Sequence, residues 1–178
     1  MNRSALARTI HDVSNLKGEF VLRSGATATE YFDKYLFESD PALLKAIAEQ
    51  LLPLIPTGAE ALAGLELGGV PIATVLSQLS GLPLLSVRKK AKDYGTRRLA
   101  EGGEVAGRRL VVIEDVVTSG GQVVISTADL RALGATIDTA LCVIDREAGG
   151  RAALAEAGVE LKALFTMSEL KLAAGRED

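Results

Sequence analysis

The segment at residues 110–123, which reads LVVIEDVVTSGGQV, constrains the fold of this chain more than any other stretch. It begins with an unbroken apolar run, the pattern of a strand that is covered on both faces in a parallel sheet. Glu114 and Asp115 follow where the strand is expected to emerge, at the carboxyl edge of the sheet, where open α/β folds bind their ligands. The segment therefore predicts a ligand site at a sheet edge.

The residues after the acidic pair form a turn that suits a phosphate group. Thr118 and Ser119 offer hydroxyls, and Gly120 and Gly121 let successive backbone N–H groups approach an anion closely. A helix is predicted over residues 122–133, and its N-terminal dipole points at the same place. The pattern predicts a sugar-phosphate site. The alternative is an ordinary strand-to-helix turn, in which the acids favour the helix and the glycines only turn the chain.

The chain alternates strands and helices from residue 61 onward. Strands are predicted at residues 61–67, 84–87, 109–113, 137–144 and 159–165, and helices at residues 70–79, 122–133 and 150–157. Such alternation is typical of an α/β fold with a mostly parallel sheet and right-handed crossovers. The length of 178 residues fits a single domain with a sizeable core.

The N-terminal segment, residues 1–38, is predicted to lie outside the main sheet as a hood. It contains an amphipathic helix at residues 4–13 and two β-like runs, at residues 19–22 and 30–37, which predict an antiparallel hairpin. Asp40 and Pro41 then start a helix that ends near Pro53.

Residues 89–107 have no apolar periodicity and are too long for an ordinary connection, so we expect a flexible functional loop. Basic residues gather in and just before its first half, and this local field suits a small polyanion such as pyrophosphate. The alternative is a solvated charged loop. The basic residues are Arg88, Lys89, Lys90, Lys92, Arg97 and Arg98.

Composition excludes several classes of function. A formal charge of −3 argues against electrostatic binding along a nucleic acid, because the phosphate backbone requires a basic protein surface. Apolar stretches are broken before the ~20 residues that a membrane span needs, so a cytoplasmic protein is expected. Cys142 is the only cysteine, so no disulfide can form within the chain. His11, the sole histidine, is expected to lie away from every motif.

The segment around Glu114 resembles the 5-phosphoribosyl 1-diphosphate (PRPP) signature of type I phosphoribosyltransferases. The resemblance implies their fold, a central mostly parallel sheet flanked by helices with a small N-terminal hood that contains a β-hairpin. It also implies that Glu114 and Asp115 hold the ribose hydroxyls and that the following turn wraps the 5-phosphate. The residues of that turn are Val116, Val117, Thr118, Ser119, Gly120, Gly121 and Gln122.

The loop sequence RKKAKDYG resembles the catalytic loop of orotate phosphoribosyltransferases. The resemblance implies that Arg88, Lys89 and Lys92 bind PRPP, and that the two lysines stabilise the departing pyrophosphate. Tyr94 stands where the family commonly has His, and its phenol donates a hydrogen bond but carries no positive charge. In that family the loop reaches into the neighbouring subunit's site, which implies a homodimer.

Two further segments are similar to the same family. In FVLRSGATATEYFD, Arg23 falls at the family's basic position, and Tyr31 and Phe32 at its aromatic pair, which packs on the pyrimidine. Arg146 matches the residue that binds orotate, whose carboxylate an Arg fork can accept bidentately, and Thr118 is expected beside it. The alternatives are hairpin core for the aromatic pair, and a surface ion pair with Asp145 or Glu147 for Arg146.

The resemblance implies transfer of the phosphoribosyl group from PRPP to orotate in pyrimidine synthesis. Mg²⁺ is expected through PRPP oxygens rather than in a protein cage, with Asp115 as a candidate additional ligand. The implied catalytic residues are Lys89, Lys92, Glu114 and Asp115. The alternatives are a phosphoribosyltransferase for a purine base and a non-catalytic PRPP-sensing regulator. One departure stands at Gly68, where some family members carry a Lys that contacts pyrophosphate.

Overall fold

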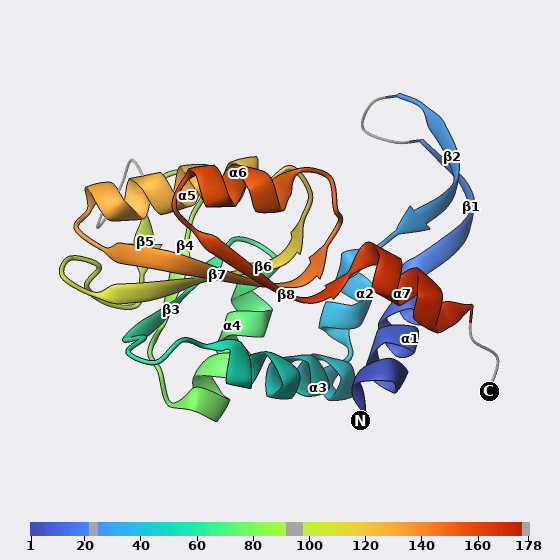
Figure 1. Cartoon of the computed structure of the whole chain (residues 1–178), viewed down its shortest axis with the longest axis horizontal. Coiled ribbons are helices and arrows are strands. Elements are labelled where there is room, and N and C mark those ends of the chain that lie inside the picture. The colour runs from blue at the N-terminus through green and yellow to red at the C-terminus, as the bar shows by residue number, and fades with distance from the viewer. Residues whose placement is uncertain (22–24, 92–97, 176–178) are drawn as a thin grey trace.

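The computed structural model describes residues 1–21, 25–91 and 98–175 and is built around a six-stranded sheet (Figure 1). The strand order is β5-β4-β3-β6-β7-β8, and every neighbouring pair is parallel except β4 and β5. This sheet confirms the predicted fold class. The strands are β3 (Ala61–Leu65), β4 (Leu84–Val87), β5 (Ala100–Glu101), β6 (Arg109–Val117), β7 (Thr136–Asp145) and β8 (Glu160–Thr166).

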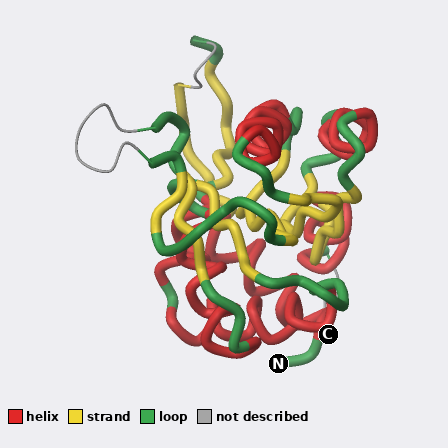
Figure 2. The backbone as a smooth tube through the Cα atoms, turned by 90° about the vertical axis from the view of Figure 1, so that its left-hand side faces the viewer, coloured by secondary structure: helices red, strands yellow, loops and turns green. Residues whose placement is uncertain are grey.

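Helices cover both faces of the sheet, as Figures 1 and 2 show. On one face lie α3 (Pro41–Leu51) and α4 (Gly69–Ser80), and on the other α5 (Gly121–Ala132) and α6 (Gly150–Glu156). Side chains of strand β6 belong to the core on both faces of the sheet, because successive side chains of a strand point to opposite faces. Val111 and Ile113 belong to one buried cluster, and Leu110 and Val112 to the other. Burial on both faces explains the unbroken apolar run in the sequence.

The N-terminal hairpin stands apart from the main sheet and projects from it (Figure 1). It consists of β1 (Asn15–Val21) and β2 (Thr27–Phe32), which pair antiparallel, as predicted. The predicted second strand at residues 30–37 is wrong beyond Phe32. The carboxylate of Asp33 accepts a hydrogen bond from the Tyr35 N–H, which caps a short helix, α2 (Lys34–Ser39).

The described residues contain further helices at the two ends of the chain and after α3. Helix α1 (Arg3–Ser14) packs on α7 (Met167–Ala174), which the sequence analysis did not predict. Thr166 and Glu169 form a reciprocal capping box that starts α7. A single 3-10 turn, η1 (Leu52–Leu54), follows α3. No helix in the described ranges has the length and apolar character to cross a membrane.

Two predicted boundaries change the position of functional residues. Strand β6 does not end at residue 113 but continues to Val117, which pairs with Asp145, so Glu114 and Asp115 lie within the strand. The segment predicted as one loop at residues 89–107 contains β5, which pairs with Ser86 and Val87 at the edge of the sheet. Residues 92–97 of that loop lie outside the described residues.

Candidate functional site

The turn between β6 and α5 forms a hollow of about 180 Å³ at the carboxyl edge of the sheet, which we call the phosphate hollow after the ligand that the sequence predicts there. Gly120 precedes α5 in a left-handed conformation, with φ 76°. The turn is also tied to α6, because the Gly150 N–H donates to the Thr118 carbonyl at 3.0 Å. This arrangement supports the interpretation as an anion cradle. The lining residues are Glu114, Val116, Val117, Thr118, Ser119, Gly120, Gly121, Gln122 and Val123.

Only glycine fits at position 120. A Cβ there would lie 2.6 Å from Leu154 Cδ1 and 3.1 Å from Gly150 Cα, in a conformation that side chains rarely adopt. We expect Gly120→Ala to lower the free energy of unfolding by about 2–4 kcal/mol and to weaken phosphate binding at the turn.

Gly121→Ala is the matched control, because its Cβ would meet nothing nearer than Ser119 Oγ at 3.9 Å. Denaturant unfolding and phosphate titration of both variants check the expectation. Equal stability of the two variants would show that the turn tolerates a side chain at position 120.

The two adjacent carboxylates have different surroundings. Glu114 lines the phosphate hollow, whereas the side chain of Asp115 is fully buried, with 0% exposure. The Lys34 ammonium lies 2.5 Å from Asp115 Oδ2, and the Val116 N–H donates to the other oxygen, Oδ1. A Cβ at Gly68 would lie 1.6 Å from Asp115 Oδ2, so this packing requires a glycine there. The sequence predicts that both acids face the ligand together, whereas in the structure only Glu114 lines the hollow.

Three carboxyl groups share this cluster with one ammonium group. Burial and hydrogen bonding to Asp115 raise the pKa of Glu38 to about 8. Burial and the charge of Asp115 raise the pKa of Glu114 to about 9. Burial also acts to raise the pKa of Asp115, but hydrogen bonds from Glu114 and Lys34 outweigh it and lower that pKa. At neutral pH the cluster therefore holds one ionised carboxylate, Asp115, paired with Lys34.

The raised pKa of Glu38 predicts a pH-dependent stability. Because this pKa rises from 4.5 to about 8 on folding, the contribution of Glu38 to stability is fully present below pH 4.5 and is lost as the pH rises toward 8. A glutamine keeps the shape and cannot ionise. In buffer free of divalent metal, we expect Glu38→Gln to match the wild-type Tm near pH 5 and to exceed it by roughly 3 °C or more near pH 8.5. A Tm difference that stays constant with pH would contradict this assignment.

A second hollow of about 230 Å³ lies between the hood and the sheet edge. It adjoins the phosphate hollow, because Val116 and Thr118 line both. Its other lining residues are Tyr31, Phe32, Asp33, Lys34, Tyr35 and Arg146. The structure therefore brings together all four residues predicted to bind orotate, which are Tyr31, Phe32, Thr118 and Arg146.

Arg146 is exposed, and its guanidinium has no ion pair among the residues that the structure describes. The alternative of a surface pair with a neighbouring acid is not observed. Asp145 pairs instead with Arg151 at 3.2 Å, and Glu147 accepts a hydrogen bond from Ser168 Oγ at 2.6 Å. The Arg146 fork is therefore available to a planar anion.

The aromatic pair packs within the protein and also lines a hollow. Tyr31 stacks on Phe20 in the hairpin, with ring centroids 5.6 Å apart, and remains 44% exposed. Phe32 is half-buried and packs against the main core. Both rings nevertheless line the second hollow.

Three residues near the site, Lys34, Glu38 and His11, were not predicted from sequence. Lys34 was assigned to a strand, and the signal that could have placed it was Asp33, a helix cap before an apolar run. His11 was expected away from every motif, which is wrong, because α1 brings it to a small hollow that Phe32 and Arg146 also line.

The basic residues of the loop are only partly described. Arg88 lies 3.7 Å from Glu101 of β5, and the Lys89 N–H donates to Glu66 Oε1 at 2.6 Å. Neither residue lines the two hollows. Arg23, Lys92 and Tyr94 lie outside the described residues, so their predicted roles stay predictions.

Comparison with known proteins gives consistent relatives, although no family model matches the chain. The orotate phosphoribosyltransferase of Nocardioides sp. is 55% identical over 170 residues, which are 96% of this chain and 95% of that protein. The orotate phosphoribosyltransferase of Halobacterium salinarum is 48% identical over 153 residues, 86% of this chain and 87% of that protein. The crystal structure of Mycobacterium tuberculosis orotate phosphoribosyltransferase with Fe(III) dicitrate superposes with a TM-score of 0.84 at 28% identity, covering 94% of this chain and 98% of that one.

Proposed function

This chain belongs to the orotate phosphoribosyltransferase family, and from that premise we propose how its two hollows perform the reaction. The enzyme transfers the 5-phosphoribosyl group of PRPP to orotate, which gives orotidine 5′-monophosphate and pyrophosphate in pyrimidine synthesis. The observation that carries the proposal is the shared wall of the phosphate hollow and the second hollow at Val116 and Thr118. Two substrates bound there meet at that wall.

PRPP occupies the phosphate hollow. The 5-phosphate accepts hydrogen bonds from the backbone N–H groups and hydroxyls of residues 118–122. The positive end of the α5 dipole also stabilises it. Glu114 lines this hollow, and Asp115 is the ionised member of the acidic cluster. Both acids accept hydrogen bonds from the ribose hydroxyls. The flexible side chain of Lys34 moves aside when the ribose reaches Asp115.

Orotate occupies the second hollow. Its carboxylate pairs with the free guanidinium of Arg146, and its ring packs beside Tyr31 and Phe32. A neutral purine offers no carboxylate to this fork, which favours orotate over a purine base.

The protein positions the reactants rather than forming a covalent bond to them. The orotate ring nitrogen N1 gives up its proton to solvent water and then donates its electron pair to the ribose anomeric carbon. The bond from that carbon to the pyrophosphate oxygen breaks, and pyrophosphate leaves with the bonding electrons. Positive charge develops on the ribose in the transition state, and the Asp115 carboxylate offsets it.

Mg²⁺ fits the chemistry of this site. The oxygens of the Asp115 carboxylate and of the protonated Glu114 carboxyl group are hard donors of the kind that Mg²⁺ prefers. Among the described residues, no group of three or more His, Cys, Asp or Glu side chains could hold a metal ion, so in this proposal Mg²⁺ would be held mainly by PRPP oxygens and waters, with Asp115 as a candidate protein ligand. When bound, the ion neutralises charge on the pyrophosphate.

The basic loop completes the site from a neighbouring subunit in this proposal. Arg23, Arg88, Lys89, Lys92 and Tyr94 bind the pyrophosphate end of PRPP, and the catalytic unit is a cytoplasmic homodimer. The pairing of Arg88 with Glu101 supports a loop whose base is fixed at the sheet edge.

The loss of orotate ultraviolet absorbance on addition of PRPP and Mg²⁺ tests the proposed function. We expect the absorbance to fall with orotate and to stay constant when adenine or xanthine replaces it. A change with a purine and none with orotate would show that the base assignment is wrong. PRPP binding without turnover of any base would favour the regulator.

A further inference from the structure

The turn that carries Arg146 is held at the end of the sheet. The Arg146 N–H donates to the Val117 carbonyl at 2.9 Å, which fixes its backbone against the last residue of β6. Its side chain lines both the second hollow and the smaller hollow beside His11. The direction of the guanidinium therefore depends on the two residues that flank Arg146.

Both flanking residues are acids, and each is bound elsewhere. Asp145 is buried, and its carboxylate accepts hydrogen bonds from Arg151 Nε at 3.2 Å and from the Glu147 N–H at 2.9 Å. The Glu147 carboxylate accepts two hydrogen bonds from Ser168, at 3.0 Å from the N–H and 2.6 Å from Oγ. The turn is thus tied to β7 on one side and to the start of α7 on the other.

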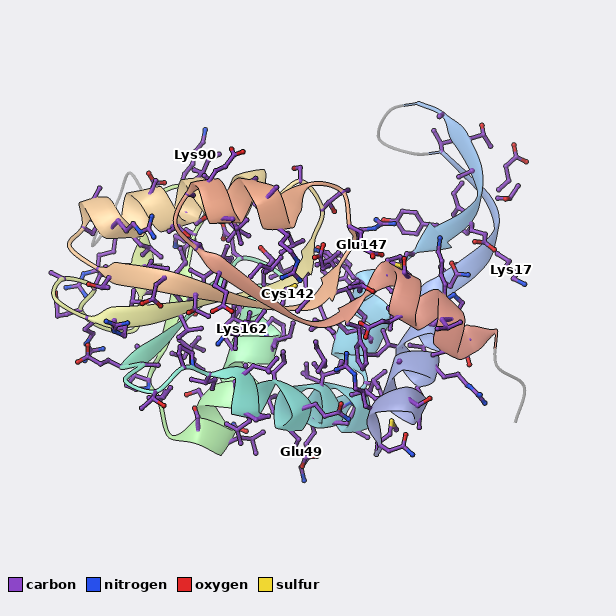
Figure 3. All side chains as sticks on the ribbon, in the orientation of Figure 1. Lys17, Glu49, Lys90, Cys142, Glu147 and Lys162 are labelled. Atoms are coloured by element: carbon purple, nitrogen blue, oxygen red, sulfur yellow. The ribbon has the colours of Figure 1, made fainter. Side chains whose placement is uncertain are left out.

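Glu147 has a backbone conformation that needs support. Its φ is 58°, in the left-handed region that residues with a Cβ rarely adopt. Figure 3 shows Glu147 beside the start of α7, where the helix presents its N-terminal N–H groups. The two hydrogen bonds from Ser168 also lower the pKa of Glu147, so its carboxylate stays ionised and bound there. This contact spans two distant parts of the chain and holds the turn in place.

We propose that Glu147 is a positioning residue for Arg146. Its attachment to Ser168 holds the turn so that the guanidinium faces the second hollow, and it keeps the Glu147 carboxylate from pairing with Arg146 itself. The contact makes the first turn of α7 part of the base-binding apparatus. This inference rests on the proposed function, in which Arg146 binds the orotate carboxylate.

Steady-state kinetics of Glu147→Ala and Ser168→Ala test the proposal. We expect Glu147→Ala to raise KM for orotate by about 5- to 50-fold, while KM for PRPP and kcat change less than about twofold. Ser168→Ala keeps the backbone N–H and raises KM for orotate by a smaller factor. Glu147→Gln, which keeps an acceptor oxygen, restores most of the affinity. Glu49→Ala is the control, because Glu49 is an exposed acid on α3, far from the turn (Figure 3).

A double-mutant cycle with Arg146→Gln separates the two levels of the proposal. We expect Arg146→Gln to raise KM for orotate by about 100-fold or more, and Glu147→Ala to add nothing in that background. If Arg146→Gln leaves KM for orotate unchanged, the proposed role of Arg146 is wrong. If Arg146→Gln raises KM for orotate but Glu147→Ala does not, only the positioning role is overturned. The same conclusion follows if Glu147→Ala raises KM for orotate and KM for PRPP equally. Ser168→Ala decides the matter if Glu147→Ala fails to fold.

Discussion

Asp115→Asn is expected to lower kcat/KM for PRPP by on the order of 10³-fold. Asp115 is the carboxylate of its cluster that stays ionised, because hydrogen bonds from Glu114 and Lys34 lower its pKa against the effect of burial. An asparagine keeps the shape but cannot offset positive charge on the ribose. It also leaves the Lys34 ammonium without its partner at 2.5 Å. Initial rates at varied PRPP concentration measure the loss.

The comparison with Glu114→Gln makes this expectation specific to charge. Burial raises the pKa of Glu114 to about 9, so a glutamine resembles the protonated form that is present at neutral pH. We expect Glu114→Gln to lower kcat/KM for PRPP by about tenfold or less. Asp138→Asn is the control for stability, because Asp138 pairs with Arg109 at the opposite end of β7. Equal losses at positions 114 and 115 would show that the ionisation state of Asp115 is not what matters.

Lys92→Ala is expected to lower kcat by about 10²- to 10³-fold and to leave the fold intact. The departing pyrophosphate gains negative charge in the transition state, and a lysine ammonium that reaches it stabilises that charge. Because the proposed contacts of Lys92 are with the pyrophosphate end of PRPP and not with orotate, KM for orotate should change little. Stopped-flow or steady-state assays, together with thermal unfolding of the same samples, provide the measurement.

Lys90→Ala is the matched control for Lys92. It removes the same charge from the same loop, and Lys90 is exposed at its described edge (Figure 3). We expect kcat of this variant to change by less than about threefold, because a solvated lysine contributes only to the overall electrostatic field of the loop. Equal effects of the two substitutions, or a wild-type rate for Lys92→Ala, would mean that no single lysine has the proposed role.

The sequence alone predicted the sheet and the phosphate turn, because both depend on local patterns. An apolar run covered on both faces produced β6, and the left-handed Gly120 produced the turn that precedes α5. Gly81, which is also left-handed, ends α4 near the predicted residue. Such features require particular residues at adjacent positions, and the sequence displays them directly.

The acidic cluster could not be predicted from the sequence. Lys34 and Glu38 reach Asp115 only because α2 forms and packs near the end of β6. The segment that contains α2 is rich in aromatic and apolar residues, and this β-like composition indicated a strand. The Asp33 cap stabilises a helix instead of a strand, and tertiary packing brings the Lys34 and Glu38 side chains to Asp115.

The contacts of Arg146 show the same limit. The sequence DRE predicted either a ligand fork or a surface ion pair, and spacing alone did not distinguish them. In the structure the ion pair is not formed among the described residues, because Arg151 and Ser168 bind the two neighbouring acids. Neither partner could be identified from the turn itself, because Arg151 lies in α6 and Ser168 in α7, and α7 was not predicted from the sequence.

The proposed PRPP site can be tested with a crystal of this protein soaked with PRPP and Mg²⁺. The account predicts density for the 5-phosphate on the backbone N–H groups of residues 118–122, and for the ribose hydroxyls beside Glu114 and Asp115, with the Lys34 side chain moved away from Asp115. Phosphate density at another edge of the sheet, or a ribose that both carboxylates face away from, would contradict it.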